Sequence, residues 1–320
     1  MHDTSKLWMS TVVLCVSLAA CGETGSDEPD GGDPNDGSGG ASADALDACP
    51  GEGLSAGDHH GSLEHDGVTF DYVLHVPPNY DHATHTPLVL NLHALMGSAD
   101  AQIEGTNLNT PADAAGYIVV YPESPTASWD GGACCLNGGS RDDVGLVRAL
   151  VADIQTRLCV DDKRIYATGM SNGGFLSHRL ACEASDLIAA VAPVAAVNGM
   201  ETCTPSRPIP VLRFHGTADS LVPYEGIAGF VRNYISVEQS FTDWAARNGC
   251  TDGMPTESFQ NGDAHCRSYT ECDDDAEVTL CLVDGMDHCW PGGACLSGSA
   301  ADDIVASERI IDFFGQHAMP

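Results

Sequence analysis

A serine on a glycine-bounded turn is the residue whose setting in this chain most clearly indicates chemistry. Ser171 lies in the run 169–173, which fits G-x-S-x-G, between an expected strand over 164–168 and an expected helix over 173–184. A nucleophilic serine needs such a turn because its oxygen must point out of the sheet, and glycine removes side chains that would clash. The pattern predicts Ser171 as a nucleophile. The alternative is a glycine-rich turn that only joins strand to helix.

A nucleophilic serine needs a base, and the base needs an acid that orients it. An expected strand over 211–214 leads into Asp219, and a later one over 278–283 leads into His288. The chain order serine, acid, histidine is that of α/β-hydrolases. We therefore expect Asp219 as the orienting acid and His288 as the general base for Ser171.

Other acids and histidines have weaker positions. Asp284 and Asp287 remain in reserve as the orienting acid, although neighbours in an extended loop point apart. We expect His215 to form structural hydrogen bonds and His93 to shape its loop. Three more histidines have no cysteine or carboxylate at ligand spacing, which favours solvated surface groups over a metal site: His59, His60 and His65. We expect no metal and no cofactor.

Backbone N–H groups should stabilise the negative charge that develops on the substrate carbonyl oxygen. One donor is the N–H of Asn172, the residue after the nucleophile. The other comes from the loop after the expected strand over 88–93, where Leu95 is our choice and Ala94 the second. Two tryptophans in nearby loops either wall the substrate site or simply pack those loops: Trp129 and Trp290.

Strands alternate with helices along the folded part of the chain. The expected strands are 68–76 (of the exposed or edge kind), 88–93, 118–121, 164–168, 188–194, 211–214 and 278–283. The expected helices are 111–115, 143–158 (capped by Asp142 or Asp143), 173–184, 237–248 and 302–317. This alternation with nearly continuous apolar strands predicts an α/β fold, a mostly parallel central sheet flanked by helices on both faces. Chemistry in such sheets lies beyond the carboxyl ends of the strands.

Several segments in series resemble one family of enzymes. They are Arg157–Asp161, Tyr166–Gly174, Arg179–Glu183, Ala190–Ala195, His215–Asp219 with Val222–Tyr224, Asn248–Cys250, and His288 with Trp290–Gly292. They look like the extracellular polyhydroxybutyrate depolymerase and feruloyl esterase group, carbohydrate esterase family one, of the α/β-hydrolase superfamily. The resemblance runs from about Val68 to the C-terminus. It implies hydrolysis of carboxylic esters without a metal or organic cofactor, with Ser171, Asp219 and His288 on the triad positions.

The chain departs from that family at two loops. The family usually has glycine where this chain has Ala94, which concerns the shape of the oxyanion loop. Around the base, Met286, Asp287 and Cys289 replace the usual glycines and threonine, which concerns the substrate pocket. The substrate stays open among a polyester, a feruloylated polysaccharide and a small ester.

Acidic residues dominate the composition. The chain has 13 Lys and Arg against 46 Asp and Glu, a formal net charge of −33. Such a charge repels nucleic acid phosphates and anionic lipid surfaces, which excludes nucleic acid as a partner. The acidity favours solubility outside the cell or tolerance of salt.

The N-terminal residues indicate export. Lys6 precedes a short apolar run over 7–20, followed by Cys21, as in a bacterial lipoprotein signal. We expect a signal peptide over 1–20, lipidation of Cys21, an acidic flexible tether over 21–47 and a catalytic domain over 48–320. The alternative is a simple secretory peptide. Membrane contact is expected only through the lipid, so the protein is either a cell-envelope lipoprotein or secreted.

Fourteen cysteines suggest an oxidising compartment. Without Cys15 and Cys21, twelve remain, an even number consistent with complete pairing. We expect the adjacent Cys134 and Cys135 to reach different partners. Guesses for three pairs are Cys289 with Cys295, Cys250 with Cys272, and Cys266 with Cys281.

The prediction is thus an exported serine esterase. Rival functions are an acyltransferase or a serine peptidase with the same triad, or a non-catalytic lipoprotein that binds a polymer.

Overall fold

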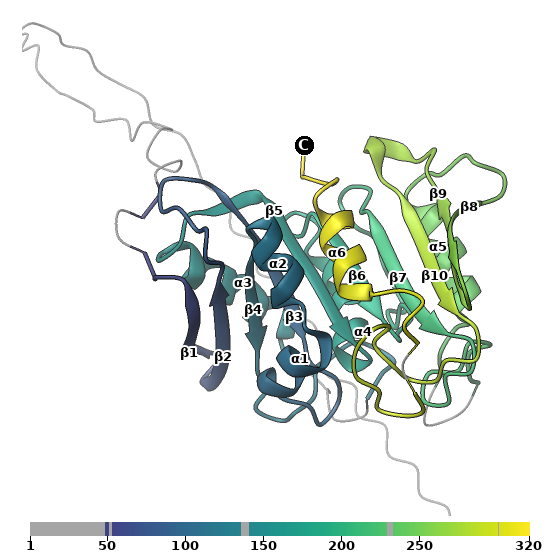
Figure 1. The fold of residues 1–320 in the computed structure, drawn as a ribbon, viewed down its shortest axis with the longest axis horizontal. Coiled ribbons are helices and arrows are strands. Elements are labelled where there is room, and N and C mark those ends of the chain that lie inside the picture. Colours follow the sequence, from purple (N-terminus) through teal and green to yellow (C-terminus); the bar gives the residue numbers. More distant parts are fainter. Residues whose placement is uncertain (1–48, 51–52, 136–140, 229–232, 300) are drawn as a thin grey trace, which may run out of the picture. The chain divides into compact units, whose positions relative to one another are not determined.

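One mixed sheet of ten strands organises the described residues in the computed structural model of the protein (Figure 1). The strand order is β1-β2-β4-β3-β5-β6-β7-β10-β9-β8. The six strands from β4 to β10 run parallel, and the pairs at both edges run antiparallel. The strands are β1 (Gly57–His65), β2 (Val68–Val76), β3 (Thr86–Leu92), β4 (Ile118–Pro122), β5 (Val160–Met170), β6 (Ala190–Val194), β7 (Val211–Gly216), β8 (Thr256–Asn261), β9 (Ala264–Tyr269) and β10 (Val278–Val283).

The structure describes residues 49–50, 53–135, 141–228, 233–299 and 301–320. The predicted signal over 1–20, the lipidation site Cys21 and the tether over 21–47 lie outside the described residues and stay predictions. In the part that is described, no helix is both long enough and apolar enough to cross a membrane.

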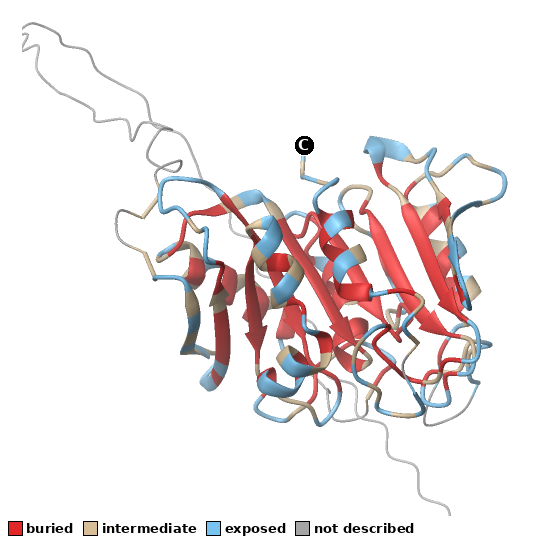
Figure 2. Ribbon diagram, in the orientation of Figure 1, coloured by how far each residue is buried: buried red, intermediate tan, exposed pale blue. Residues whose placement is uncertain are grey.

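Helices cover both faces of the sheet, which confirms the predicted α/β class. One core layer holds Leu88 and Leu90 of β3 together with side chains of α3, α4 and α5. The other holds Val89 together with side chains of α1, α2 and α6, because successive strand residues point to opposite faces. Figure 2 shows the buried central strands between partly exposed helices. The helices are α1 (Ala99–Thr106), α2 (Asn109–Ala115), α3 (Asp143–Gln155), α4 (Asn172–Glu183), α5 (Val237–Arg247) and α6 (Ala306–Phe314), with a 3₁₀ turn η2 (Asp273–Asp275).

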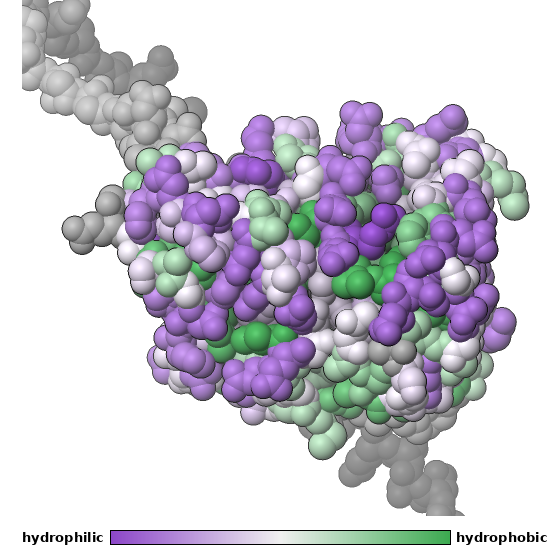
Figure 3. All heavy atoms as spheres, in the orientation of Figure 1, coloured by the Kyte–Doolittle hydropathy of each residue, from purple (hydrophilic) through white to green (hydrophobic). Residues whose placement is uncertain are grey.

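The sheet edges differ from the sequence-based expectation. β2 was expected to be an exposed or edge strand, but β1 pairs with it along its whole length and forms the edge itself. The sequence did not predict β1 and β8 because these strands are rich in His, Gly, Ser, Thr and Glu. Polar strands of this kind occur where one or both faces meet water. Hydrophilic side chains likewise cover most of the molecular face in Figure 3.

Helix α3 is capped by Asp142 and not by Asp143. The Asp142 side chain accepts a hydrogen bond from the Gly145 N–H at 2.8 Å and is the N-cap. Asp143 is fully buried and instead pairs with Arg141 and accepts from the Asp130 N–H at 2.6 Å. The two adjacent carboxylates therefore have different roles, one capping the helix and one holding the loop around Trp129.

Six disulfides pair the twelve cysteines from Cys49 to Cys295. The three guessed pairs are present: Cys289–Cys295, Cys250–Cys272 and Cys266–Cys281. The expectation for Cys134 and Cys135 was wrong, because these neighbours bridge each other. The remaining pairs are Cys49–Cys159 and Cys182–Cys203.

The buried Cys266–Cys281 bridge joins directly opposite residues of β9 and β10. Its partners are 15 residues apart in sequence. A cross-link that closes a loop of this length lowers the conformational entropy of the unfolded chain. This stabilises the folded protein by about 3 kcal/mol. We expect Cys266→Ala with Cys281→Ala to lower the free energy of unfolding by about this amount, as measured by urea titration. An unchanged unfolding midpoint would show that the bridge does not stabilise this edge of the sheet.

Candidate active site

Ser171 lies at the sharp turn between β5 and α4. Its backbone is in the positive-φ region (φ 53°, ψ −118°), which few residues other than glycine adopt without cost. The Ser171 N–H donates to the Val194 carbonyl at 2.9 Å, and the Ser171 carbonyl accepts from the Phe175 N–H at 2.9 Å. The turn is thus fixed to the end of β6 on one side and to the helix on the other. A strained serine between strand and helix matches the predicted nucleophile elbow.

His288 and Asp219 form a buried pair at the ends of neighbouring strands. The His288 Nδ1 donates to the Asp219 Oδ2 at 2.7 Å, and both side chains are buried. The other carboxylate oxygen, Oδ1, accepts from the N–H groups of Leu221 and Val222 at 2.9 and 2.7 Å. Three donors therefore hold the carboxylate, and the carboxylate sets the orientation of the imidazole.

The second imidazole nitrogen, His288 Nε2, is buried and has no hydrogen-bond partner among the described residues. In the neutral ring the proton is on Nδ1, so Nε2 presents a lone pair. Four other histidines among the described residues also have a buried ring nitrogen without a partner, so the bond to Asp219 is what distinguishes His288. A vacant, oriented Nε2 is the property that a general base needs.

Backbone hydrogen bonds link the three loops laterally. Ser171 is bonded to the end of β6, and Ala195, just after β6, donates to Phe214 of β7 at 2.9 Å. The Ala218 N–H, in the loop of Asp219, donates to the Met286 carbonyl in the loop of His288 at 3.1 Å. Because β5, β6, β7 and β10 are consecutive parallel neighbours, their carboxyl ends share one edge. The sheet thus brings the loops of Ser171, Asp219 and His288 to the same edge.

The alternatives for the acid and base do not take these positions. Asp284 is exposed, and its carboxylate accepts no hydrogen bond from the described residues. Asp287 bonds to Ser220 and Ser297 rather than to the imidazole ring of His288. Among the acids of the described residues, only Asp219 bonds to the imidazole ring of His288.

His215 and His93 have the structural contacts expected of them. The His215 Nε2–H donates to the Val222 carbonyl at 2.9 Å, and burial lowers the pKa of His215 to about 4. The His93 Nδ1–H donates to the Ala94 carbonyl at 2.7 Å, and its Nε2 accepts from the Ser124 N–H at 3.1 Å. Both rings are neutral hydrogen-bonding groups, one beneath Asp219 and one at the oxyanion loop.

Backbone N–H groups are available for an oxyanion at the predicted positions. The N–H groups of Leu95, of Asn172 and of Ala94, the second choice, donate to no described residue. The next two N–H groups of the first loop are occupied, since Met96 donates to Ala127 and Gly97 donates to Ala94. Leu95 and Asn172 fit the predicted oxyanion role, with Ala94 still open as the second choice, and this role remains a proposal.

Trp129 requires a correction. It was predicted as a possible substrate wall, yet its side chain is 0% exposed, and its indole N–H donates to the His93 carbonyl at 3.0 Å. The Asn172 side chain brackets the Trp129 backbone, accepting from its N–H at 2.6 Å and donating to its carbonyl at 2.8 Å. Trp129 thus packs its loop and links the two oxyanion segments. The residue types alone could not show this, because tryptophan serves both roles.

A mainly apolar cavity of about 220 Å³ lies beside the loop of Leu95 and the end of β5. It is lined by Leu95 of the candidate oxyanion loop, by Met170 directly before Ser171, and by Leu296, which follows the loop closed by the Cys289–Cys295 disulfide. Trp290, the second predicted substrate wall, lines it too, although its indole N–H donates to the Ser307 hydroxyl at 3.0 Å. The cavity can take an apolar acyl or alcohol group beside the candidate nucleophile.

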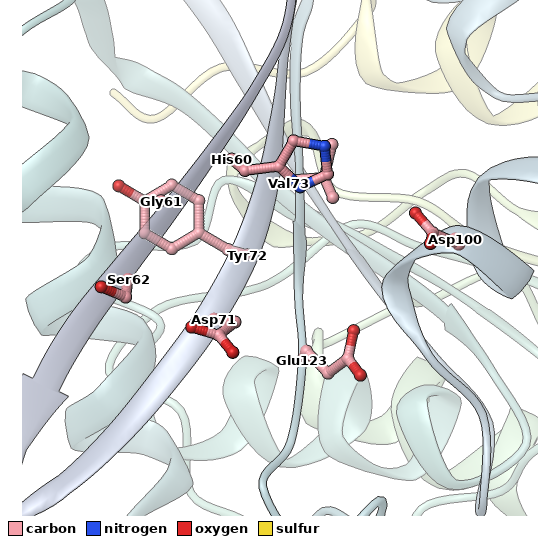
Figure 4. Close-up of a pocket in the computed structure, with 8 residues that line it drawn as sticks. All are labelled: His60, Gly61, Ser62, Asp71, Tyr72, Val73, Asp100 and Glu123. Atoms are coloured by element: carbon pink, nitrogen blue, oxygen red, sulfur yellow. The ribbon is translucent and has the colours of Figure 1, made fainter.

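A second hollow lies beside β1, β2 and Asp100 of helix α1 (Figure 4). Its volume is about 500 Å³, and it is lined by His60 of β1, Asp71 of β2, Asp100 and Glu123 among others. The Glu123 carboxylate already accepts from the Ala99 N–H at 3.2 Å. None of the predicted site residues lines this hollow, whereas Leu95 and Trp290 line the smaller cavity, so this hollow is not the candidate site.

His65 has two carboxylate neighbours, of which only Asp66 is near it in the sequence. Its Nε2 lies 3.8 Å from Asp66 and 3.6 Å from Asp142, the cap of the distant helix α3. Of the other two histidines in that group, His60 is exposed and the His59 ring bonds to the Ser55 carbonyl at 2.7 Å. His65 is therefore more enclosed than the surface group expected.

The fold and this site define an α/β-hydrolase. The chain belongs to the family described as Esterase PHB depolymerase, which matches residues 70–239. It is similar to feruloyl esterase B of Piromyces equi, with 35% identity over 217 residues, 63% of this chain and 39% of that protein. A putative esterase, NocK, of Nocardia uniformis subsp. tsuyamanensis is 29% identical over 77% of this chain and 79% of its own length.

A bifunctional acetylxylan esterase/xylanase of Neocallimastix patriciarum is 31% identical, and the chain spans 24% of its length. The chain thus covers well under half of these two esterases from Piromyces and Neocallimastix. Among solved structures, an acetyl xylan esterase from Aspergillus awamori has a TM-score of 0.56 at 15% identity, covering 80% of this chain and 99% of that one. At that identity the likeness establishes the fold.

The elbow depends on the close approach of Gly173 to the backbone of β3. A Cβ at this position would collide with the carbonyl oxygens of Leu92 and His93. We expect Gly173→Ala to lower the free energy of unfolding by about 1–3 kcal/mol, as overpacking does, measured by urea titration. Gly253→Ala is the matched control, since a Cβ there meets no atom within 4 Å. Equal stability of the two variants would contradict the tight elbow.

Buried neutral histidines make stability depend on pH. Burial lowers the pKa of His215 to about 4 and that of His178 well below 6.5. The unfolded chain therefore binds more protons than the folded one below pH 6.5. The stability that these depressed histidine pKa values contribute is fully present above pH 6.5 and is lost as the pH falls toward 4. We expect calorimetry to show a Tm lower by on the order of 5 °C at about pH 5 than at about pH 7. A constant Tm would show that these rings are not held neutral.

Proposed function

We propose that the protein is a serine carboxylic ester hydrolase that acts through Ser171, His288 and Asp219. The single observation that carries this proposal is the buried Asp219–His288 hydrogen bond with an unpaired Nε2. It occurs on an α/β-hydrolase sheet whose elbow serine lies at the same edge, in a chain of an esterase family. A carboxylate, an oriented imidazole and a serine in this order are the parts of a hydrolytic triad.

The steps follow from the groups present. The His288 Nε2 takes the hydroxyl proton as Ser171 Oγ forms a bond to the ester carbonyl carbon. The N–H groups of Leu95 and Asn172 stabilise the resulting oxyanion, each contributing on the order of 3 kcal/mol. The tetrahedral intermediate collapses to an acyl-enzyme while His288 returns the proton to the departing alcohol. Water then repeats the sequence and releases the acid.

The substrate is an ester whose smaller part fits beside the nucleophile. The cavity lined by Met170, which precedes Ser171, and by Leu95 measures about 220 Å³ and is mostly apolar. Such a space takes a compact apolar group, whereas a polymer chain would have to continue outside it. Similar proteins are named feruloyl esterase and acetylxylan esterase, so polyester, feruloylated polysaccharide and small esters are the substrates to compare.

Export belongs to the same proposal. Six disulfides in the described residues are typical of proteins that fold outside the reducing cytosol. The sequence supports a signal peptide over 1–20 and either lipidation at Cys21 or simple secretion. Mass spectrometry of the N-terminal peptide of the exported protein distinguishes these two fates.

The nucleophile is tested directly by substitution. We expect Ser171→Ala to lower kcat for p-nitrophenyl ester hydrolysis by at least about 10⁴-fold, because no other group can form the acyl-enzyme. The exposed Ser55→Ala is the matched control and should retain wild-type rates. Wild-type turnover by Ser171→Ala, with an unchanged far-UV spectrum, would remove the assignment. Product analysis with an added alcohol distinguishes hydrolysis from acyl transfer to that alcohol.

A further inference from the structure

The carboxylate of Asp287 makes four hydrogen bonds although it lies at the surface and does not touch the imidazole ring. Its Oδ1 accepts from the N–H of Ser220, the hydroxyl of Ser220 and the N–H of His288, each at 2.8 Å. Its Oδ2 accepts from the Ser297 hydroxyl at 2.6 Å. Four donors on one half-buried carboxylate are a specific arrangement rather than a solvated side chain.

These four donors belong to two connections of the candidate active site, β7–α5 with Ser220 and β10–α6 with His288 and Ser297. Ser220 directly follows Asp219, so its two bonds hold the loop of the acid. The N–H of His288 belongs to the loop of the base. Ser297 follows Leu296, which lines the substrate cavity. One side chain thus joins the acid, the base and the cavity wall.

The cavity wall is attached to the base loop by further bonds. The N–H groups of Leu296 and Ser297 both point to the His288 carbonyl, at 2.9 and 3.4 Å. The Cys289–Cys295 disulfide closes the loop that carries Trp290. Gly298 lies so close that a Cβ there would meet the Asp287 Cβ at 2.6 Å. Asp287 therefore contacts a segment that follows the disulfide-closed loop and is hydrogen-bonded to the backbone of His288.

The donors keep Asp287 ionised in ordinary conditions. The Ser297 hydroxyl and the Ser220 N–H are the largest of the causes that lower the pKa of Asp287 to about 2. The carboxylate is thus an acceptor at every pH where a neutral imidazole can act as a base. Without these donors the carboxylate would adopt many positions, because water solvates it equally well in each of them.

We infer that Asp287 is a positioning residue that holds the Asp219 loop, the His288 loop and the cavity wall in one arrangement through its hydrogen bonds. This inference rests on the proposed function, since a positioned base matters only if His288 is one. It differs from a role as the orienting acid, because the imidazole contacts Asp219. It concerns the hydrogen bonds of Asp287 and not its charge.

The roles of hydrogen bond and charge can be separated by substitution. Asp287→Asn retains Oδ1, which accepts three of the four bonds, and its amide can donate to the Ser297 hydroxyl in place of the fourth. Asp287→Ala removes all four. Asp284→Ala is the matched control, because it removes one charge from the same loop, and that carboxylate accepts no bond from the described residues.

The experiment is steady-state hydrolysis of a p-nitrophenyl ester by the full exported protein and these variants. We expect Asp287→Ala to lower kcat by about 10- to 100-fold, the cost of a base displaced by on the order of 1 Å. Asp287→Asn should stay within about threefold of the wild type, and Asp284→Ala should match it. Ser297→Ala, which frees only the wall, should raise KM more than it lowers kcat.

Two results would overturn the inference. The first is a kcat of Asp287→Ala equal to that of Asp284→Ala. The second is a kcat of Asp287→Asn as low as that of Asp287→Ala, which would assign the effect to charge. If Asp287→Ala does not fold, Ser220→Ala with Ser297→Ala removes two of the bonds, and a wild-type kcat for that variant would be equally adverse. A failure of the proposed function is distinct, because the wild type would then be no faster than Ser171→Ala.

Discussion

The site depends on the hydrogen bond between the buried carboxylate of Asp219 and the buried imidazole of His288. A carboxylate taken out of water is stable only where donors replace its hydration, and two backbone N–H groups and the imidazole do so here. The same bond fixes the proton on Nδ1 and leaves Nε2 as the acceptor. Since β7 and β10 are paired in parallel, with Gly216 opposite Val283, the two loops leave the sheet side by side. The strand order, more than the loops themselves, thus makes the pair possible.

Much of this arrangement could be predicted from the sequence because its signals are local. The strand, the turn over 169–173 and the helix are contiguous, and the strained conformation of Ser171 is what that pattern requires. Asp219 and His288 could be assigned because each follows an apolar strand of the buried kind, and such strands end at one edge. The same reasoning predicted the parallel centre of the sheet, since nearly continuous apolar strands that alternate with helices are typical of parallel pairing.

The features that the sequence did not show depend on contacts between distant segments. The residue type of Trp129 allows a role as a substrate wall, but the Asn172 side chain holds its backbone inside the core. The pairing of Cys134 with Cys135 contradicts the expectation that neighbours bond elsewhere, which rested on local geometry alone. The polar strand β1 has no apolar pattern, and it forms because β2 offers it a free edge. The donors of Asp287 come from loops whose approach only the fold decides.

The central claim is that Ser171, His288 and the two backbone N–H groups act on one substrate carbonyl. A crystal structure of the protein after reaction with a fluorophosphonate tests it most directly, because the probe leaves a tetrahedral phosphonyl group on an activated nucleophile. We predict a bond from phosphorus to the Ser171 Oγ, a phosphonyl oxygen within hydrogen-bond distance of the Leu95 and Asn172 nitrogens, and the His288 Nε2 beside the Oγ. An adduct on another residue, or an Nε2 that lies away from the modified serine, would contradict the claim.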